Sequence, residues 1–163
     1  MNIVGVYFTK TGVTEDVMMR LKDALGMQTY NLKENIEVRL NDAEKIVIGT
    51  PIYVGMIPKK VVHFINQNKT EILNKELSIY IIGGEQPKDY QALFNVSNID
   101  PAILQHASHI IYCGGEFRYD KLNFVSRSLL KMVHKKKAKE AQNDTMPSLN
   151  NQAIEKLIEV LES

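Results

Sequence analysis

The sequence contains very little cysteine: Cys113 is the only one in 163 residues. One cysteine cannot form a disulfide within a chain, and it cannot supply a cysteine cluster for a metal. Long hydrophobic runs are also missing, since no stretch approaches the roughly 18 consecutive apolar residues that a membrane span needs. The first 20 residues lack the apolar block behind a basic start that a signal peptide requires. We therefore expect a soluble, cytoplasmic protein.

An excess of one charge is missing as well. The chain has 20 Lys and Arg against 19 Asp and Glu, so its overall charge does not indicate nucleic acid as a partner. The spacing of the histidines predicts no metal site; they are His63, His106, His109 and His134. The length is that of one domain, and we expect residues 1–163 to form it.

What the chain does have is an alternation of apolar runs and helical patterns. Four apolar runs rich in β-branched residues are residues 2–8, 45–50, 77–83 and 109–114, and residues 27–32 are a weaker fifth. Nearly continuous apolar runs are typical of parallel strands that are buried on both faces. Helical patterns occupy residues 14–25, 58–67, 123–138 and 150–161, and residues 141–151 have the composition of a polar linker. This order predicts a doubly wound α/β fold with the first strand near the centre.

The loop after the first strand, residues 9–14, has the sequence TKTGVT. Ligands of such sheets bind beyond the carboxyl ends of the strands, where this loop lies. Thr9, Thr11 and Thr14 offer hydroxyl groups, and Gly12 allows close approach of the backbone. The helix that follows presents free N–H groups and the positive end of its dipole, so the loop predicts a phosphate site. A cap at Thr14 with a turn at Gly12 is the simpler alternative, but a cap needs one hydroxyl group instead of three.

The charges around this loop are mixed. Lys10 is its only cation, so we expect neutral donors to provide most of the phosphate binding. Glu15 and Asp16 follow the loop and place negative charge beside the predicted anion. Acidic residues are also ordinary in the first turn of a helix, so they do not exclude the phosphate site.

The hexapeptide Thr9-Lys10-Thr11-Gly12-Val13-Thr14 resembles the T-x-T-G-x-T phosphate loop of flavodoxins, which holds the 5′-phosphate of FMN. The resemblance implies a flavodoxin-like fold, a five-stranded parallel sheet in the order 2-1-3-4-5. It also implies FMN as the cofactor. All six residues of the loop are then expected to contact its phosphate.

The same resemblance places the flavin ring against two further loops. In the loop after the third strand the expected contacts are Thr50, Pro51, Ile52, Tyr53, Val54 and Gly55. Tyr53 and Met56 are candidate walls for the ring, and Gly55 is where a peptide could reorient with the redox state of the flavin. After the fourth strand the expected contacts are Gly83, Gly84, Glu85 and Gln86. From the residues alone, Tyr53 equally suits a surface position and the glycines equally suit a plain turn.

Residues 112–140 resemble one particular group of flavodoxin-fold enzymes. Gly115, Arg118 and Tyr119, followed by an amphipathic helix, resemble the G-x-x-R-Y segment of flavodoxin-fold, menaquinone-dependent protoporphyrinogen oxidases. A second pattern, G-x-x-I-x-x-G, is matched by Gly49, Ile52 and Gly55. The resemblance implies FMN-dependent oxidation with a quinone as acceptor, and Arg118 and Tyr119 as candidate substrate residues. Arg118 suits either a substrate carboxylate or a structural ion pair, and both interpretations stay open.

Residues 131–139 carry five lysines, which suit either a solvated helix end or peripheral contact with an anionic membrane. Three functions remain: an FMN-dependent oxidoreductase for a small molecule, a flavodoxin-type one-electron carrier for a redox-partner protein, and a module without redox activity. Carriers of this family are usually strongly acidic, so the balanced charge favours the oxidoreductase. The intact threonines argue against the third function. No side chain is an evident acid or base catalyst, and Cys113 is expected to behave as a small hydrophobic residue.

Overall fold

The computed structural model describes residues 1–116, 118, 128, 132 and 147–163. Five parallel strands form one sheet in the order β2-β1-β3-β4-β5. They are β1 (Ile3–Tyr7), β2 (Gln28–Asn31), β3 (Lys45–Pro51), β4 (Glu76–Ile82) and β5 (His109–Tyr112). The predicted fold and strand order are confirmed, including the weaker strand over residues 27–32.

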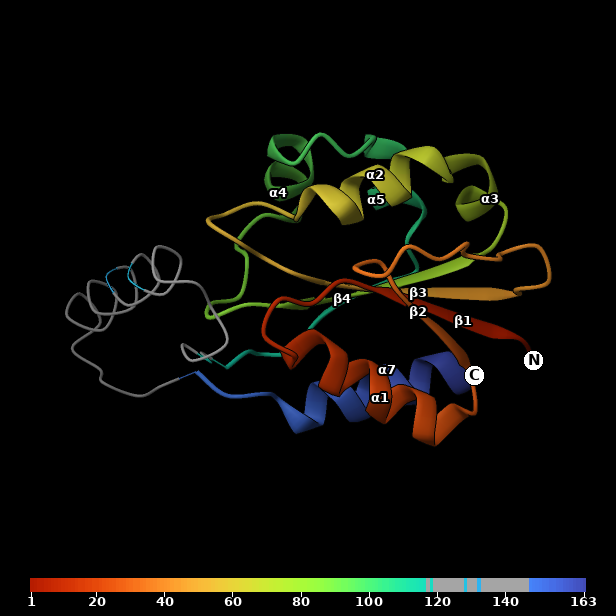
Figure 1. Cartoon of the computed structure of the whole chain (residues 1–163), viewed down its shortest axis with the longest axis horizontal. Coiled ribbons are helices and arrows are strands. Elements are labelled where there is room, and N and C mark those ends of the chain that lie inside the picture. Colours follow the sequence, from red (N-terminus) through yellow and green to blue (C-terminus); the bar gives the residue numbers. More distant parts are fainter. Residues whose placement is uncertain (117, 119–127, 129–131, 133–146) are drawn as a thin grey trace.

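Helices cover both faces of this sheet. They are α1 (Val13–Leu25), α2 (Lys59–Gln67), α3 (Lys69–Leu73), α4 (Tyr90–Val96), α5 (Pro101–His106) and α7 (Asn151–Glu162). Figure 1 shows α1 and α7 on one face, with α2, α3, α4 and α5 on the other. None of the described helices is long and apolar enough to cross a membrane.

The sequence predicts the longer helices and misses the short ones. α1, α2 and α7 start and end within one or two residues of their predicted bounds. α3, α4 and α5 have only five to seven residues, which is too short for a helical period to stand out. Apart from residues 128 and 132, the predicted helix over residues 123–138 lies outside the described residues, as does most of the predicted linker.

The core consists of two apolar clusters, one on each face of the sheet. Side chains alternate between the faces along a strand. Towards α2, α4 and α5 the strands contribute Val4, Val6, Ile46, Ile48, Ile79 and Ile81. Towards α1 and α7 they contribute Ile3, Tyr7, Val47, Tyr80 and Ile82. Since both faces are buried, β1, β3 and β4 read as continuous apolar runs in the sequence.

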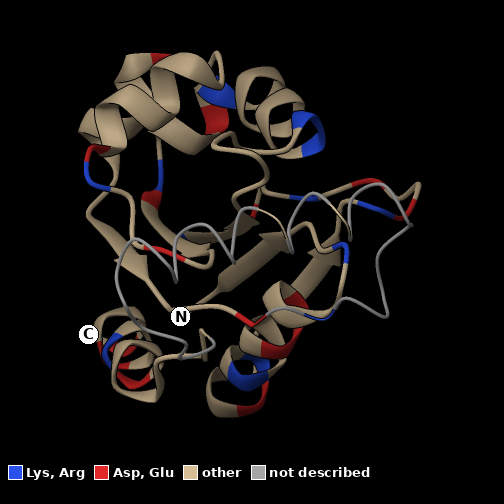
Figure 2. Cartoon of the chain, turned by 90° about the vertical axis from the view of Figure 1, so that its left-hand side faces the viewer, with Lys and Arg blue, Asp and Glu red and all other residues tan. Residues whose placement is uncertain are grey.

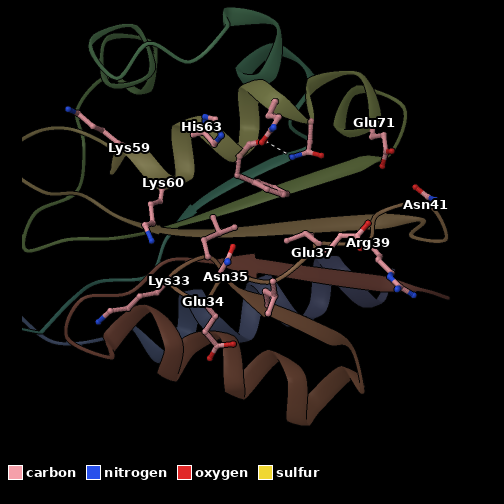
Figure 3. A pocket seen from close by; sticks show the side chains of 16 residues that line it. Lys33, Glu34, Asn35, Glu37, Arg39, Asn41, Lys59, Lys60, His63 and Glu71 are labelled. Atoms are coloured by element: carbon pink, nitrogen blue, oxygen red, sulfur yellow. Dashed lines mark hydrogen bonds between the residues drawn. The ribbon is translucent and has the colours of Figure 1, made fainter.

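The connection between β2 and β3 differs from the other crossovers, because residues 32–44 contain no helix. An open groove of about 970 Å³ lies between this connection and α2 (Figure 3). Side chains of both charges line it, among them Lys33, Glu34, Glu37, Arg39, Lys60 and Glu71. None of the residues predicted to bind the cofactor lines this groove, so it is separate from the predicted site.

Candidate functional site

The loop between β1 and α1 turns at a left-handed glycine immediately before the helix begins. Gly12 precedes the first residue of α1 and has a φ of +94°, in the left-handed region that favours glycine. The Thr9 hydroxyl oxygen accepts the Gly12 N–H at 2.8 Å, which holds the loop against the end of β1. Thr14 lies within the first turn of α1, whose N-cap position is Gly12. The alternative of a Thr14 cap is therefore wrong.

Several donors of this loop have no partner among the described residues. The N–H groups of Val13 and Thr14 belong to the first turn of α1, where no helical acceptor is available. The hydroxyl group of Thr14 likewise has no hydrogen bond to a described residue, although Thr14 is only 1% exposed. Unpaired donors at the positive end of a helix are suited to a phosphate dianion.

The two acidic residues of the first turn are each occupied by a partner. The Tyr7 hydroxyl donates to Glu15 Oε1 at 3.1 Å, and Arg118 Nη2 donates to Asp16 Oδ2 at 2.5 Å. Burial is the main cause that raises the pKa of Tyr7 to about 12, and the Glu15 carboxylate adds to it. The phenol therefore stays a donor to Glu15 at neutral pH. This pairing reduces the conflict that the sequence shows between these carboxylates and a bound phosphate.

Tyr80 on β4 contacts the backbone at the start of α1, next to the phosphate loop. It is fully buried, and its hydroxyl group donates to the backbone carbonyl of Thr14 at 2.7 Å. Its ring occupies the space above Gly49 on β3, where any side chain would overlap it. Gly49 therefore has a packing role, although in the sequence it stands out only as the first glycine of the G-x-x-I-x-x-G pattern.

The loop after β3 lies beside the phosphate loop. Lys10 Nζ lies 4.3 Å from the centre of the Tyr53 ring, a cation–π contact that joins the two loops. Tyr53 is half-buried, and burial raises the pKa of its hydroxyl group. Thr50 and Pro51 are buried at the end of β3, where the Thr50 hydroxyl group donates to the Pro51 carbonyl at 2.9 Å. Their predicted contact with the cofactor stays a prediction.

Residues 53–56 form a tight turn. Tyr53 and Met56 exchange two backbone hydrogen bonds of 2.8 and 3.0 Å. The two residues between them have positive φ, +48° at Val54 and +74° at Gly55. Val54 is β-branched, so this conformation is strained, and its side chain is 71% exposed. Strain of this kind is concentrated at functional sites, which agrees with the predicted role of the loop.

We expect Val54→Asn to raise the free energy of unfolding by about 1 kcal/mol, because asparagine tolerates the left-handed region. Urea unfolding followed by circular dichroism measures this difference. Val96→Asn is the control, since Val96 is also exposed but has a negative φ. An equal or smaller effect of Val54→Asn than of the control would show that the turn stores no strain.

The loop after β4 is joined to its neighbours on both sides. The Ile52 N–H donates to the Ile82 carbonyl at 2.9 Å, and the Gly83 N–H donates to the Gly114 carbonyl at 3.0 Å. The Tyr112 hydroxyl group donates to the Gly83 carbonyl at 2.5 Å. Further along this loop are the exposed residues Gly84, Glu85 and Gln86. The predicted loops after β3 and β4 thus lie side by side at the carboxyl edge of the sheet.

The segment after β5 contributes Arg118 to the same edge, which Figure 2 shows end-on with a helical layer above and below the sheet. Arg118 makes the structural ion pairs that the sequence analysis considered, with Asp16 and Glu116. Tyr119 and the lysines of residues 131–139 lie outside the described residues. Within the described part of the chain, no three His, Cys, Asp or Glu side chains are placed to hold a metal ion.

Comparison with known protein families shows to which family the chain belongs. Residues 5–145 match the flavodoxin domain family. The chain is a member of that family. No curated protein matches the sequence.

Solved structures similar to this flavodoxin domain are distant in sequence. A flavoprotein from Lactobacillus acidophilus, solved in complex with FMN, has 12% identity and a TM-score of 0.53, over 68% of this chain and 92% of that one. The flavodiiron core Flv1 from Synechocystis sp. PCC6803 has 11% identity and a TM-score of 0.51, over 69% of this chain and 30% of that one. At such low identity these likenesses show the fold alone.

Proposed function

We propose that this flavodoxin domain binds FMN and acts as an oxidoreductase. One observation carries the proposal: a threonine-rich loop with a left-handed glycine lies at the start of α1, directly beyond β1, an inner strand of the sheet. Membership in the flavodoxin domain family supports it. A flavoprotein of the same fold from Lactobacillus acidophilus was solved in complex with FMN, which also favours the proposal.

The residues present fit the cofactor. The donors of residues 9–14 would hold its phosphate through backbone N–H groups and the hydroxyl groups of Thr11 and Thr14. Ile52, Tyr53 and Gly83 would lie against its ring, because the two loops that carry them are adjacent. Ile52 lies beside Gly83, since two of its side-chain atoms are 3.8 Å from the position that a Cβ atom on Gly83 would occupy.

When bound, FMN accepts electrons from one molecule and passes them to another. The part of the chain described here would bind and orient it. Tyr80 would hold the phosphate loop in place, because its hydroxyl group donates a hydrogen bond to the Thr14 carbonyl. We assign no side chain as an acid or base, because none is placed for that role by the observed contacts.

Our first proposal for the reaction is oxidation of a small molecule. The specific substrate that we propose is protoporphyrinogen, with a quinone as the electron acceptor. It rests on the resemblance of Gly115, Arg118 and Tyr119 to the oxidase segment and on the balanced charge of the chain. Peripheral contact of residues 131–139 with a membrane would bring the site to a membrane-dissolved quinone. The alternative is a one-electron carrier for a redox-partner protein, which the fold supports equally well.

The test of FMN binding is a titration of the purified protein, followed by flavin fluorescence and by the visible spectrum after desalting. Thr11→Asp is expected to weaken FMN binding about tenfold or more, because a carboxylate beside the phosphate repels it. Thr70→Asp is the matched control, since Thr70 is exposed on α3 on the other face of the sheet. Absence of FMN binding to the unchanged protein would refute the proposal.

A turnover assay distinguishes the two proposed functions, the oxidase and the one-electron carrier. With FMN bound, an oxidase should convert protoporphyrinogen to the fluorescent porphyrin at a rate that depends on an added quinone. A carrier should instead reduce a one-electron acceptor protein such as cytochrome c and leave porphyrinogen oxidation at its background rate. Either result decides between the two functions without changing the FMN assignment.

A further inference from the structure

Arg118 lies directly over the phosphate loop, although the two are 107 positions apart along the chain. Its Nη1 atom is 3.4 Å from the Thr11 carbonyl oxygen. The same Nη1 atom is 3.0 Å from the point that a Cβ atom on Gly12 would occupy. The guanidinium group therefore lies against the loop backbone, next to the N-terminal end of α1.

Two carboxylates hold the guanidinium in this position. Nη2 donates to Asp16 Oδ2 at 2.5 Å and is 3.1 Å from Glu116 Oε2, to which Nε donates at 3.1 Å. These hydrogen bonds raise the pKa of Arg118, chiefly through Asp16, so the group is fully charged. The hydrogen bonds to Asp16 and Glu116 use the Nε and Nη2 atoms of the planar guanidinium group.

The Nη1 side has donor capacity left. Its only contact with a described residue is the long one to the Thr11 carbonyl. Arginine donates to phosphate oxygens more strongly than a neutral group does, because the hydrogen bond is charge-assisted. Nη1 thus lies beside the neutral donors of the loop with the chemistry that a phosphate dianion requires.

We propose that Arg118 is a ligand of the FMN phosphate and selects phosphorylated flavin over riboflavin. This inference rests on the proposed function. Asp16 and Glu116 orient the guanidinium, and Arg118 in turn neutralises the Asp16 charge beside the anion. The role differs from that of the T-x-T-G-x-T loop, whose donors are neutral apart from Lys10. It also differs from the substrate-carboxylate role considered in the sequence analysis.

The experiment compares FMN and riboflavin binding by fluorescence titration of the full chain and its variants. Arg118→Ala is expected to raise the Kd of FMN about tenfold, an effect kept modest by solvent, because the Arg118 side chain is 27% exposed. The Kd of riboflavin should change less than twofold, because riboflavin has no phosphate. Arg118→Lys should recover part of the loss, since lysine keeps the charge and loses the fork.

Arg20→Ala is the matched control. Arg20 lies about two turns along α1 and bonds Asn151, so this variant removes the same charge away from the loop. The FMN Kd of the control should change less than twofold. In addition, the FMN Kd of the unchanged protein should rise more steeply between 20 and 200 mM NaCl than that of Arg118→Ala.

Three results would overturn the inference: an unchanged FMN affinity in Arg118→Ala, a tighter one, or an equal loss for both flavins. If Arg118→Ala fails to fold, the decision passes to Arg118→Lys, whose circular dichroism and FMN-to-riboflavin preference are measured in the same way. Failure of the unchanged protein to bind FMN would instead refute the proposed function, so the two failures are distinguishable.

Discussion

Replacement of Gly49 by alanine is expected to lower the free energy of unfolding by about 3–5 kcal/mol. A Cβ atom at this position overlaps the ring of Tyr80, which is fully buried. Displacing the ring would also break its hydrogen bond to the Thr14 carbonyl. The loss is large compared with the roughly 5–15 kcal/mol of a typical domain.

Urea unfolding of the two proteins measures this loss. Gly83→Ala is the matched control, because Gly83 follows the neighbouring strand and a Cβ atom there meets only ordinary contacts of 3.6 Å and longer. The control should change the free energy of unfolding by less than about 1 kcal/mol. A double-mutant cycle with Tyr80→Leu tests the cause: Gly49→Ala should be much less harmful once the ring is absent. If the cost were the same in both backgrounds, Tyr80 would not be the reason for the glycine.

Raising the pH from 9 to 11 is expected to destabilise the fold by a few kcal/mol. Burial raises the pKa of the Cys113 thiol from 9.0 to about 12 and is the main cause that raises that of Tyr7 from 10.0 to about 12. Both groups are acids whose neutral form is favoured in the folded protein. In this pH range the unfolded chain therefore binds fewer protons than the folded chain. The stability is fully present below pH 9 and falls as the pH rises, by about 1.4 kcal/mol per pH unit for each group.

The variant Cys113→Ala separates the contribution of the thiol to this pH dependence from that of the tyrosines. In the unchanged protein the free energy of unfolding should already decline between pH 9 and 10, where only Cys113 of the two groups contributes. In Cys113→Ala it should stay nearly flat there and decline only above pH 10, where Tyr7 begins to contribute. Denaturant unfolding at half-unit pH steps measures both profiles. Parallel profiles in the two proteins between pH 9 and 10 would contradict the assignment to Cys113.

The sequence predicts the strand order and the position of the threonine–glycine loop because both leave local signals. Strands buried on two faces are continuous apolar runs, and their alternation with helices allows few right-handed arrangements. The loop concentrates its threonines and glycine within six residues, so its chemistry is visible without knowledge of any contact. For the same reason Gly26 could be expected to end α1, and it does so with a φ of +62°.

Contacts between distant residues left no such signal. Tyr80 is one of several apolar residues in its strand, and nothing in the sequence couples it to Gly49 or to Thr14. Arg118 could be recognised as a candidate, but its position over residues 9–14 depends on the path of the chain after β5. The short helices α4 and α5 did leave a signal that was not used, namely the capping residues Asp89 and Asp100.

The position of α7 has a consequence for the order in which the protein is made. The helix lies beside α1, joined to it by the Arg20–Asn151 hydrogen bond, and it buries Ile154 and Leu157 on the face that also holds Tyr80. On the ribosome α7 is synthesised more than 130 residues after the loop of residues 9–14. At typical translation rates that interval is on the order of ten seconds. During it the apolar face under α7 is uncovered, so we expect a nascent chain to retain FMN only once α7 has emerged.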